Sequence, residues 1–142
     1  MKKLNFRATK LFLRFLLKIQ GLTESVLPAK DQPDLLIRKE RTIHTEDGPA
    51  YLFTIGKLLA QRPNKFEYSM TFLVIDFRQH TGERHDLIVY PAWTTDELND
   101  VKETSIVIQG DTIVSFNIRY QRAQANTAYS WLMELKLAGY LK

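Results

Sequence analysis

The chain contains no cysteine, which excludes disulfide frameworks, thiolate metal sites and cysteine nucleophiles. It also lacks a nucleophile elbow, a glycine-rich phosphate loop and a dinucleotide-binding fingerprint. No apolar run reaches the roughly 20 residues that a transmembrane helix needs. These absences fit a reducing compartment, and we expect a cytoplasmic protein, in contact with a membrane at most peripherally, that works without a cofactor or a metal.

The chain has enough apolar residues to fold as one domain. It is 142 residues long and 44% hydrophobic, so it can bury a core without help from metals or disulfides. We divide it into a basic amphipathic helix (1–23), a connector (24–34) and an antiparallel sheet domain with a final helix (35–142). The three parts form one structural domain.

The positive charge is concentrated at the amino terminus. Residues 1–20 contain no acidic residue and six basic ones: Lys2, Lys3, Arg7, Lys10, Arg14 and Lys18. The net charge of the whole chain is +4, which leaves 14 basic and 16 acidic residues from position 21 onward. The body is therefore slightly acidic, and this argues against a nucleic-acid-binding role based on overall charge.

The amino-terminal segment has the pattern of an amphipathic helix that ends near Gly21. At 100° per residue, its cations fall on one narrow stripe, and leucine and phenylalanine side chains occupy most of the remaining surface. Cations beside large apolar residues suit contact with an anionic membrane surface or with a protein partner. The residues that we expect to make this contact are Lys3, Arg7, Lys10, Arg14, Lys18, Leu11 and Phe15.

Other interpretations of this segment compete with membrane contact. Arg14 and Lys18 interrupt the apolar run that a secretory signal requires, and serine, which is common in mitochondrial presequences, is absent before Ser25. A helix packed on the sheet, with its basic stripe in water, is the simpler interpretation, because apolar helical faces usually belong to the core. The packed helix and the membrane-binding helix are compatible, because so wide an apolar arc can contact two partners.

The longest strand-like run, 66–77, is predicted to be the centre of the sheet. Its apolar residues alternate from Phe66 to Phe72, and Leu73, Val74 and Ile75 then follow without a break. One face is therefore expected to be buried along the whole strand and the second face only toward its end, where we expect a helix to cover it.

The remaining elements complete a meander of about six antiparallel strands. We expect an edge strand at Leu35–His44, a strand around Phe53, one at Asp86–Tyr90 and a hairpin of 105–108 with 112–120 around Gly110 and Asp111. Asp96–Glu103 resembles a short capped helix. Asn126 is expected to cap a final helix at 127–138 that ends at Gly139. The predicted fold class is α+β, with both helices packed on the sheet.

One polar cluster is a candidate for chemistry. Asp76 lies inside an apolar strand, and His80, Glu83 and His85 follow around the next turn. Buried carboxylates near histidines are typical of hydrolytic sites. The simpler interpretation is that Asp76 pairs with Arg78 and that the histidines are polar turn residues, because the spacing lacks the helical pattern of a zinc site.

Four functions remain compatible with these patterns. We favour a non-enzymatic domain that contacts an anionic membrane or a protein partner through its first helix, with homo-oligomerisation open. The alternatives are a carrier of a small apolar ligand in a curved-sheet cavity, a hydrolase around Asp76, and a nucleic-acid-binding module, for which the acidic body gives little support.

Overall fold

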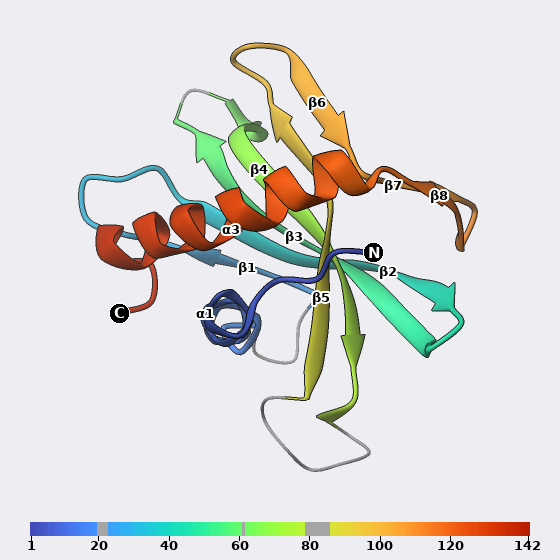
Figure 1. The fold of residues 1–142 in the computed structure, drawn as a ribbon. Helices are drawn as coiled ribbons and strands as arrows, with labels where there is room; N and C mark the ends of the chain where they lie inside the picture. The colour runs from blue at the N-terminus through green and yellow to red at the C-terminus, as the bar shows by residue number, and fades with distance from the viewer. Residues whose placement is uncertain (20–22, 61, 79–85) are drawn as a thin grey trace.

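Two helices lie on one side of a curved sheet in the computed structural model (Figure 1). The model describes residues 1–19, 23–60, 62–78 and 86–142. Within these ranges the elements are α1 (Phe6–Leu16), β1 (Glu24–Leu27), β2 (Leu35–Thr45), β3 (Gly48–Leu59), β4 (Arg62–Asp76), β5 (Leu87–Asp96), β6 (Val101–Thr104), β7 (Ile106–Gln109), β8 (Thr112–Phe116) and α3 (Ile118–Ala138). This is the α+β architecture that the sequence predicts.

Consecutive strands from β2 to β6 pair antiparallel, as a meander requires. The described sheet continues beyond β2 into β8 and β7 through one parallel bridge between His44 and Thr112. The sheet also contains two strands that the sequence did not predict. β1 lies within the predicted connector, and β6 lies where we expected the helix 96–103. That helix was a wrong prediction, because the Asp96 carboxylate closes a turn with Asn99 instead of capping a helix.

β4 is the central strand, as its sequence indicates. It pairs with β3 and with β5 along most of its length. Met70, Phe72 and Val74 face the helices, whereas Leu73 and Ile75 belong to a second apolar cluster on the opposite face. Both faces are therefore buried toward the end of the strand, as predicted.

The layer that covers the second face is a hairpin, and the prediction of a helix there was wrong. Ile106 is fully buried against this face, and Ile108 and Ile113 from the same β7–β8 hairpin pack around it. Gly110 has a φ of 66° in the hairpin loop, which confirms the predicted turn. α1 and α3 therefore both pack on the first face, which carries Met70, Phe72 and Val74.

β2 is not a simple edge strand. β1 pairs with its first four residues, and β8 joins it at His44, so both of its ends are covered. The charged middle that suggested an edge has specific partners. Arg38 forms an ion pair with Glu40 at 3.0 Å, and Arg41 donates a hydrogen bond to the Gly110 carbonyl oxygen at 2.6 Å. The pairing with β3 also shifts register between Lys39 and Thr42.

α1 is part of the main core. Asn5 caps the helix by accepting a hydrogen bond from the Ala8 amide at 2.8 Å. The fully buried Phe12 ring contacts Phe53 and Phe72 edge-on, with ring centroids 5.3 and 5.0 Å apart. The helix ends at Leu16, earlier than predicted, and Gly21 lies outside the described residues.

α3 begins nine residues before the predicted start. Asn117, not Asn126, is the amino-terminal cap, and it accepts a hydrogen bond from the Tyr120 amide. The first turns have no obvious apolar stripe because two of their buried residues are glutamines. Gln121 binds the Pro91 carbonyl oxygen and Gln124 binds the Glu103 carbonyl oxygen. Gly139 ends the helix in a left-handed conformation, as predicted.

Candidate functional site

The exposed face of α1 carries most of the predicted contact cations. Arg7, Lys10 and Arg14 are exposed and Lys18 is half-buried; we call these four residues the basic strip. Lys3 is exposed just before the helix. On an ideal helix Arg7, Lys10 and Arg14 lie within about a quarter of the circumference. These three residues therefore point to the same side of the molecule, and Lys18 follows just after α1 ends at Leu16.

Two residues predicted to make this contact are not accessible. Leu11 is 6% exposed and Phe15 is fully buried, and both belong to the core between α1 and the sheet. The apolar arc of α1 is largely covered by its own chain, which is the packed-helix arrangement. The expectation that Leu11 and Phe15 touch a membrane or a partner is corrected on this point.

Other apolar residues of this segment are exposed in their place. Phe6 is 70% exposed and Leu17 is 52% exposed. Lys10 Nζ lies 5.4 Å from the centre of the Phe6 ring, and Leu17 lines the same groove as Lys10. Sequence periodicity alone could not separate Phe6 and Leu17 from the buried residues, since it shows which residues are apolar and not which are covered.

A groove runs between α1 and α3, and the basic strip forms one wall of it. Its volume is about 500 Å³. Arg7, Lys10 and Arg14 line it from α1, and Lys136 lines it from α3. The remaining lining residues are apolar or aromatic: Leu11, Leu13, Leu17, Tyr129 and Met133. No acidic side chain is among these lining residues, so the groove has a positive potential.

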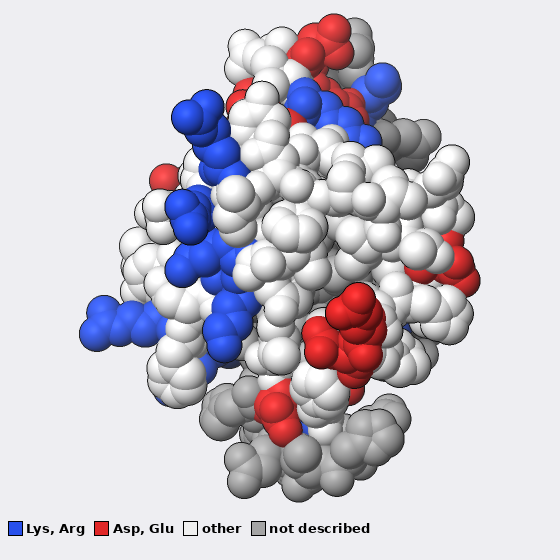
Figure 2. All heavy atoms as spheres, turned by 45° about the vertical axis from the view of Figure 1, so that its right-hand side comes forward, with Lys and Arg blue, Asp and Glu red and all other residues white. Residues whose placement is uncertain are grey.

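The described part of the structure contains no carboxylate partner for the cations of the groove. Among the residues that the structure describes, none of the ion pairs includes Arg7, Lys10, Arg14 or Lys136. Figure 2 shows Lys and Arg side chains gathered in a band along one side of the molecule, apart from most of the Asp and Glu side chains. Uncompensated charge of one sign in a groove attracts ions of the opposite sign.

The sequence of α1 places these cations where they lower the stability of the helix. Lys10 lies one turn from both Arg7 and Arg14, and like charges at such spacings destabilise a helix by about 0.2–0.5 kcal/mol per pair. Arg7 is in the first turn, at the positive end of the helix dipole, and the first turn contains no acidic residue. A bound anion would relieve these repulsions.

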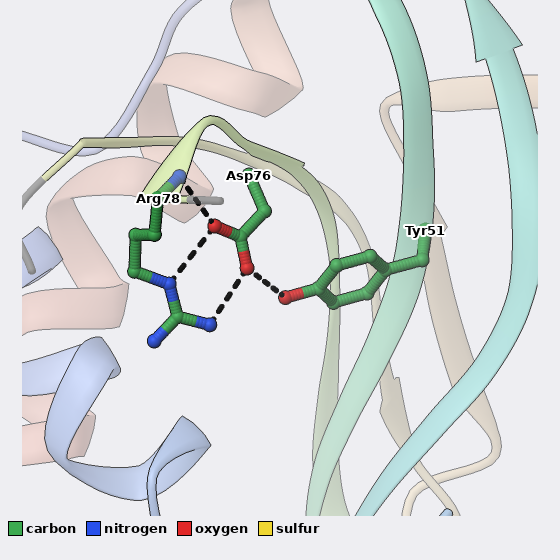
Figure 3. A network of polar contacts seen from close by, with 3 residues as sticks. All are labelled: Tyr51, Asp76 and Arg78. Atoms are coloured by element: carbon green, nitrogen blue, oxygen red, sulfur yellow. Dashed lines mark hydrogen bonds and ion pairs between the residues drawn. The ribbon is translucent and has the colours of Figure 1, made fainter. Parts of the chain in front are cut away.

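Asp76 lies at the end of β4 in a network of polar contacts with Tyr51 and Arg78 (Figure 3). The Arg78 guanidinium donates two hydrogen bonds to the carboxylate, at 2.9 and 2.7 Å, and the Arg78 amide donates a third at 3.1 Å. The Tyr51 hydroxyl donates to Oδ2 from β3 at 3.2 Å. The pairing of Asp76 with Arg78 is the simpler of the two interpretations that the sequence allowed.

This network holds Asp76 in its ionised form. Burial raises the pKa of the carboxyl, but the hydrogen bonds from Arg78 outweigh burial, so the pKa of Asp76 is lower than its ordinary value of 3.8. Burial and the nearby Asp76 raise the pKa of Tyr51 well above its ordinary value. A carboxylate stabilised in this way is a poor general acid and suits a structural role.

We expect Asp76→Asn to lower the free energy of unfolding by about 1–2 kcal/mol near neutral pH, because charge-assisted hydrogen bonds are lost. Folding lowers the pKa of Asp76, so its contribution is complete above the unfolded-state pKa and is lost as the pH falls through the folded-state pKa. The difference from wild type should therefore shrink in acid. Urea denaturation near neutral pH and again in acid measures this difference. The exposed Asp34→Asn is the control. A difference that is independent of pH would contradict the account.

The rest of the predicted polar cluster lies outside the described residues. His80, Glu83 and His85 fall in 79–85, so their relation to Asp76 stays a prediction. Within the described ranges, no group of three or more histidine or acidic side chains is placed to hold a metal ion.

The largest described cavity has mixed charge. It has a volume of about 840 Å³ and is lined by Lys65, Glu67, Glu97 and Asp100 together with apolar residues. It opens near the β5–β6 turn, on elements other than α1 and α3. The groove differs from it because all the charged residues among its described lining are cations.

Comparison with protein-family models, with curated proteins and with solved structures finds no match. In the described part of the chain, neither helix combines the length and the apolar character needed to cross a membrane. The fold and the site define an α+β protein with a basic groove between α1 and α3.

Proposed function

We propose that this protein binds anionic membrane surfaces through the exposed face of α1, without catalysing a reaction. The observation that carries the proposal is the basic strip, which has no acidic partner among the described residues and is accompanied by the exposed Phe6 and Leu17. Anionic lipids supply the missing negative charge, and the two apolar side chains supply contacts with the acyl boundary.

Electrostatic attraction provides most of the expected affinity. A basic residue close to an anionic leaflet contributes about 1 kcal/mol. Arg7, Lys10 and Arg14 from the strip, with Lys2 and Lys3 before it, are all exposed. Their combined effect is strong enough for peripheral binding and should weaken steeply as salt increases.

The buried core of α1 limits how deeply the protein can insert. Leu11, Phe12 and Phe15 hold the helix on the sheet, so they cannot enter the lipid while the fold is intact. On α1 and its carboxyl cap, the exposed apolar side chains that can insert are Phe6 and Leu17. The proposal is therefore a peripheral contact with the cytoplasmic leaflet, whose surface potential is negative.

The other functions have less support. Side chains of both helices, including Phe12 and Leu132, fill the face of the sheet that a ligand carrier would keep open. The carboxylate of Asp76 is engaged by Arg78, which gives a hydrolytic site no free acid at this position.

Vesicle co-sedimentation tests the proposal directly. The full chain is mixed with vesicles of phosphatidylcholine alone or of phosphatidylcholine with phosphatidylglycerol, at about 0.1 M and about 0.5 M salt. We expect recovery with the anionic vesicles at low salt, release at high salt and little recovery with neutral lipid. Equal recovery with both lipids, or none with either, would refute membrane binding and would leave an acidic protein partner as the candidate ligand.

A further inference from the structure

The geometry points to a phosphate monoester headgroup as the preferred ligand of the groove between α1 and α3. This inference rests on the proposed membrane binding and goes beyond it, since a general attraction to anionic lipid needs only the outer surface of α1. The groove adds a second wall, from α3, to the cations of α1.

Lys136 is the residue that distinguishes a groove ligand from a surface ligand. It is exposed in the last turn of α3, and it lines the groove opposite Arg7, Lys10 and Arg14. A headgroup that stays in the plane of the bilayer meets the α1 cations first. A headgroup that enters the groove is surrounded by cations from both helices.

A ligand with concentrated negative charge suits a groove that has cations on both walls. A phosphate monoester carries about −1.5 to −2 charges near neutral pH and three strong acceptor oxygens. A phosphodiester headgroup carries a single negative charge and has fewer free acceptor oxygens. It therefore forms weaker electrostatic interactions and fewer hydrogen bonds with four cations. Arg7 and Arg14 can each bind phosphate oxygens with two parallel hydrogen bonds, whereas the lysines act as point charges.

The groove also fits the rest of such a lipid. Its volume of about 500 Å³ is in the usual range for sites that hold a small molecule. Leu17 and Met133 are among its apolar lining residues. Glycerol and the first acyl carbons can lie against them while the phosphate contacts the cations.

A comparison of two lipids tests this inference. Vesicles containing phosphatidic acid, a monoester, and vesicles containing phosphatidylglycerol, a diester, are adjusted to the same zeta potential. We expect wild type to bind the phosphatidic acid vesicles about fivefold more tightly, which is the effect of one additional cation contact. Lys136→Gln should remove this preference and leave binding to phosphatidylglycerol unchanged. Lys102→Gln, which neutralises an exposed lysine on β6, is the matched control and should keep the preference.

Each outcome separates this inference from the proposed function. Equal binding to both lipids by wild type, or a preference that survives in Lys136→Gln, overturns the monoester site and leaves membrane binding intact. No binding to either vesicle overturns both. Soluble glycerol 3-phosphate should remove only the excess binding to phosphatidic acid. If it binds to the protein while vesicles do not, the ligand is a soluble phosphate and the lipid assignment is wrong. Thermal unfolding of each variant confirms that the fold is retained.

Discussion

Replacing Phe12 with alanine should lower the free energy of unfolding by about 3–5 kcal/mol, the range observed when a buried aromatic side chain is truncated. Phe12 is fully buried and contacts the rings of Phe53 on β3 and Phe72 on β4. The substitution removes apolar burial and both edge-on ring contacts, and it leaves a cavity where α1 meets the sheet. Urea denaturation followed by circular dichroism measures the loss.

Phe6→Ala is the control for this experiment. Phe6 belongs to the same helix but is 70% exposed, so its truncation should change the stability by less than about 0.5 kcal/mol. A loss below about 1 kcal/mol for Phe12→Ala would mean that α1 is not part of the folded core. α1 would then be a helix that can detach from the sheet.

This result also decides how membrane binding can be tested. Deleting residues 1–22 removes Phe12 and Phe15 together with the cations, so it would damage the core and the contact surface at once. Loss of lipid binding by such a truncation would have two explanations. Substitutions at exposed positions of the full chain avoid this ambiguity.

The double variant Arg7→Gln with Arg14→Gln should reduce the affinity for anionic vesicles by about 30-fold. Each neutralised arginine removes about 1 kcal/mol of attraction to the membrane, and about 1.4 kcal/mol corresponds to a factor of ten. Co-sedimentation over a range of lipid concentrations measures the affinity. The matched control neutralises two exposed lysines on β4 and β6, Lys65→Gln with Lys102→Gln, and thereby gives the same net charge.

The stability of the double variant separates binding from folding. Arg7 lies in the first turn of α1, near Lys10, so its neutralisation should stabilise the helix by a few tenths of a kcal/mol. Arg14 is in the last turn, where a cation is favourable, and its neutralisation has the opposite effect. We expect the free energy of unfolding to stay within about 0.5 kcal/mol of wild type. If the control variant loses as much affinity as the double variant, overall charge rather than the basic strip is responsible.

The fold could largely be predicted from the sequence because most of its elements have strong local patterns. The alternation from Phe66 to Phe72 and the unbroken run that follows predicted a central strand with a second face buried at one end. The Gly110 hairpin and the Gly139 stop depend on backbone conformations that glycine favours.

The predictions of the fold that were wrong missed contacts that the local sequence pattern does not show. Asn117 and Asn126 are both good caps, and the sequence does not show that Gln121 and Gln124 are buried with partners on the sheet. A capping-box pattern predicted a helix at 96–103. The segment instead forms a turn closed by hydrogen bonds to Asp96, and β6 then pairs with β5. Tertiary contacts decided each case.

The candidate site could be predicted only in part. The segregation of cations in residues 1–20 identified Arg7, Lys10 and Arg14, which do line the groove. The sequence could not show that Lys136 and Met133, more than 100 positions later, form the opposite wall. It also could not show that Leu11 and Phe15 are covered whereas Phe6 and Leu17 are exposed, because all four have the same apolar character.

Amide chemical-shift mapping with anionic bicelles shows which part of the chain contacts the membrane. In a titration of the full chain, we expect the largest shifts around Arg7, Lys10 and Arg14 on α1, with shifts around Lys136 on α3 only when the bicelles contain phosphatidic acid. The amides of β6 and of the β7–β8 hairpin should change little. Shifts centred on that hairpin, or spread evenly over the surface, would contradict the assignment of the exposed face of α1 as the membrane-binding surface.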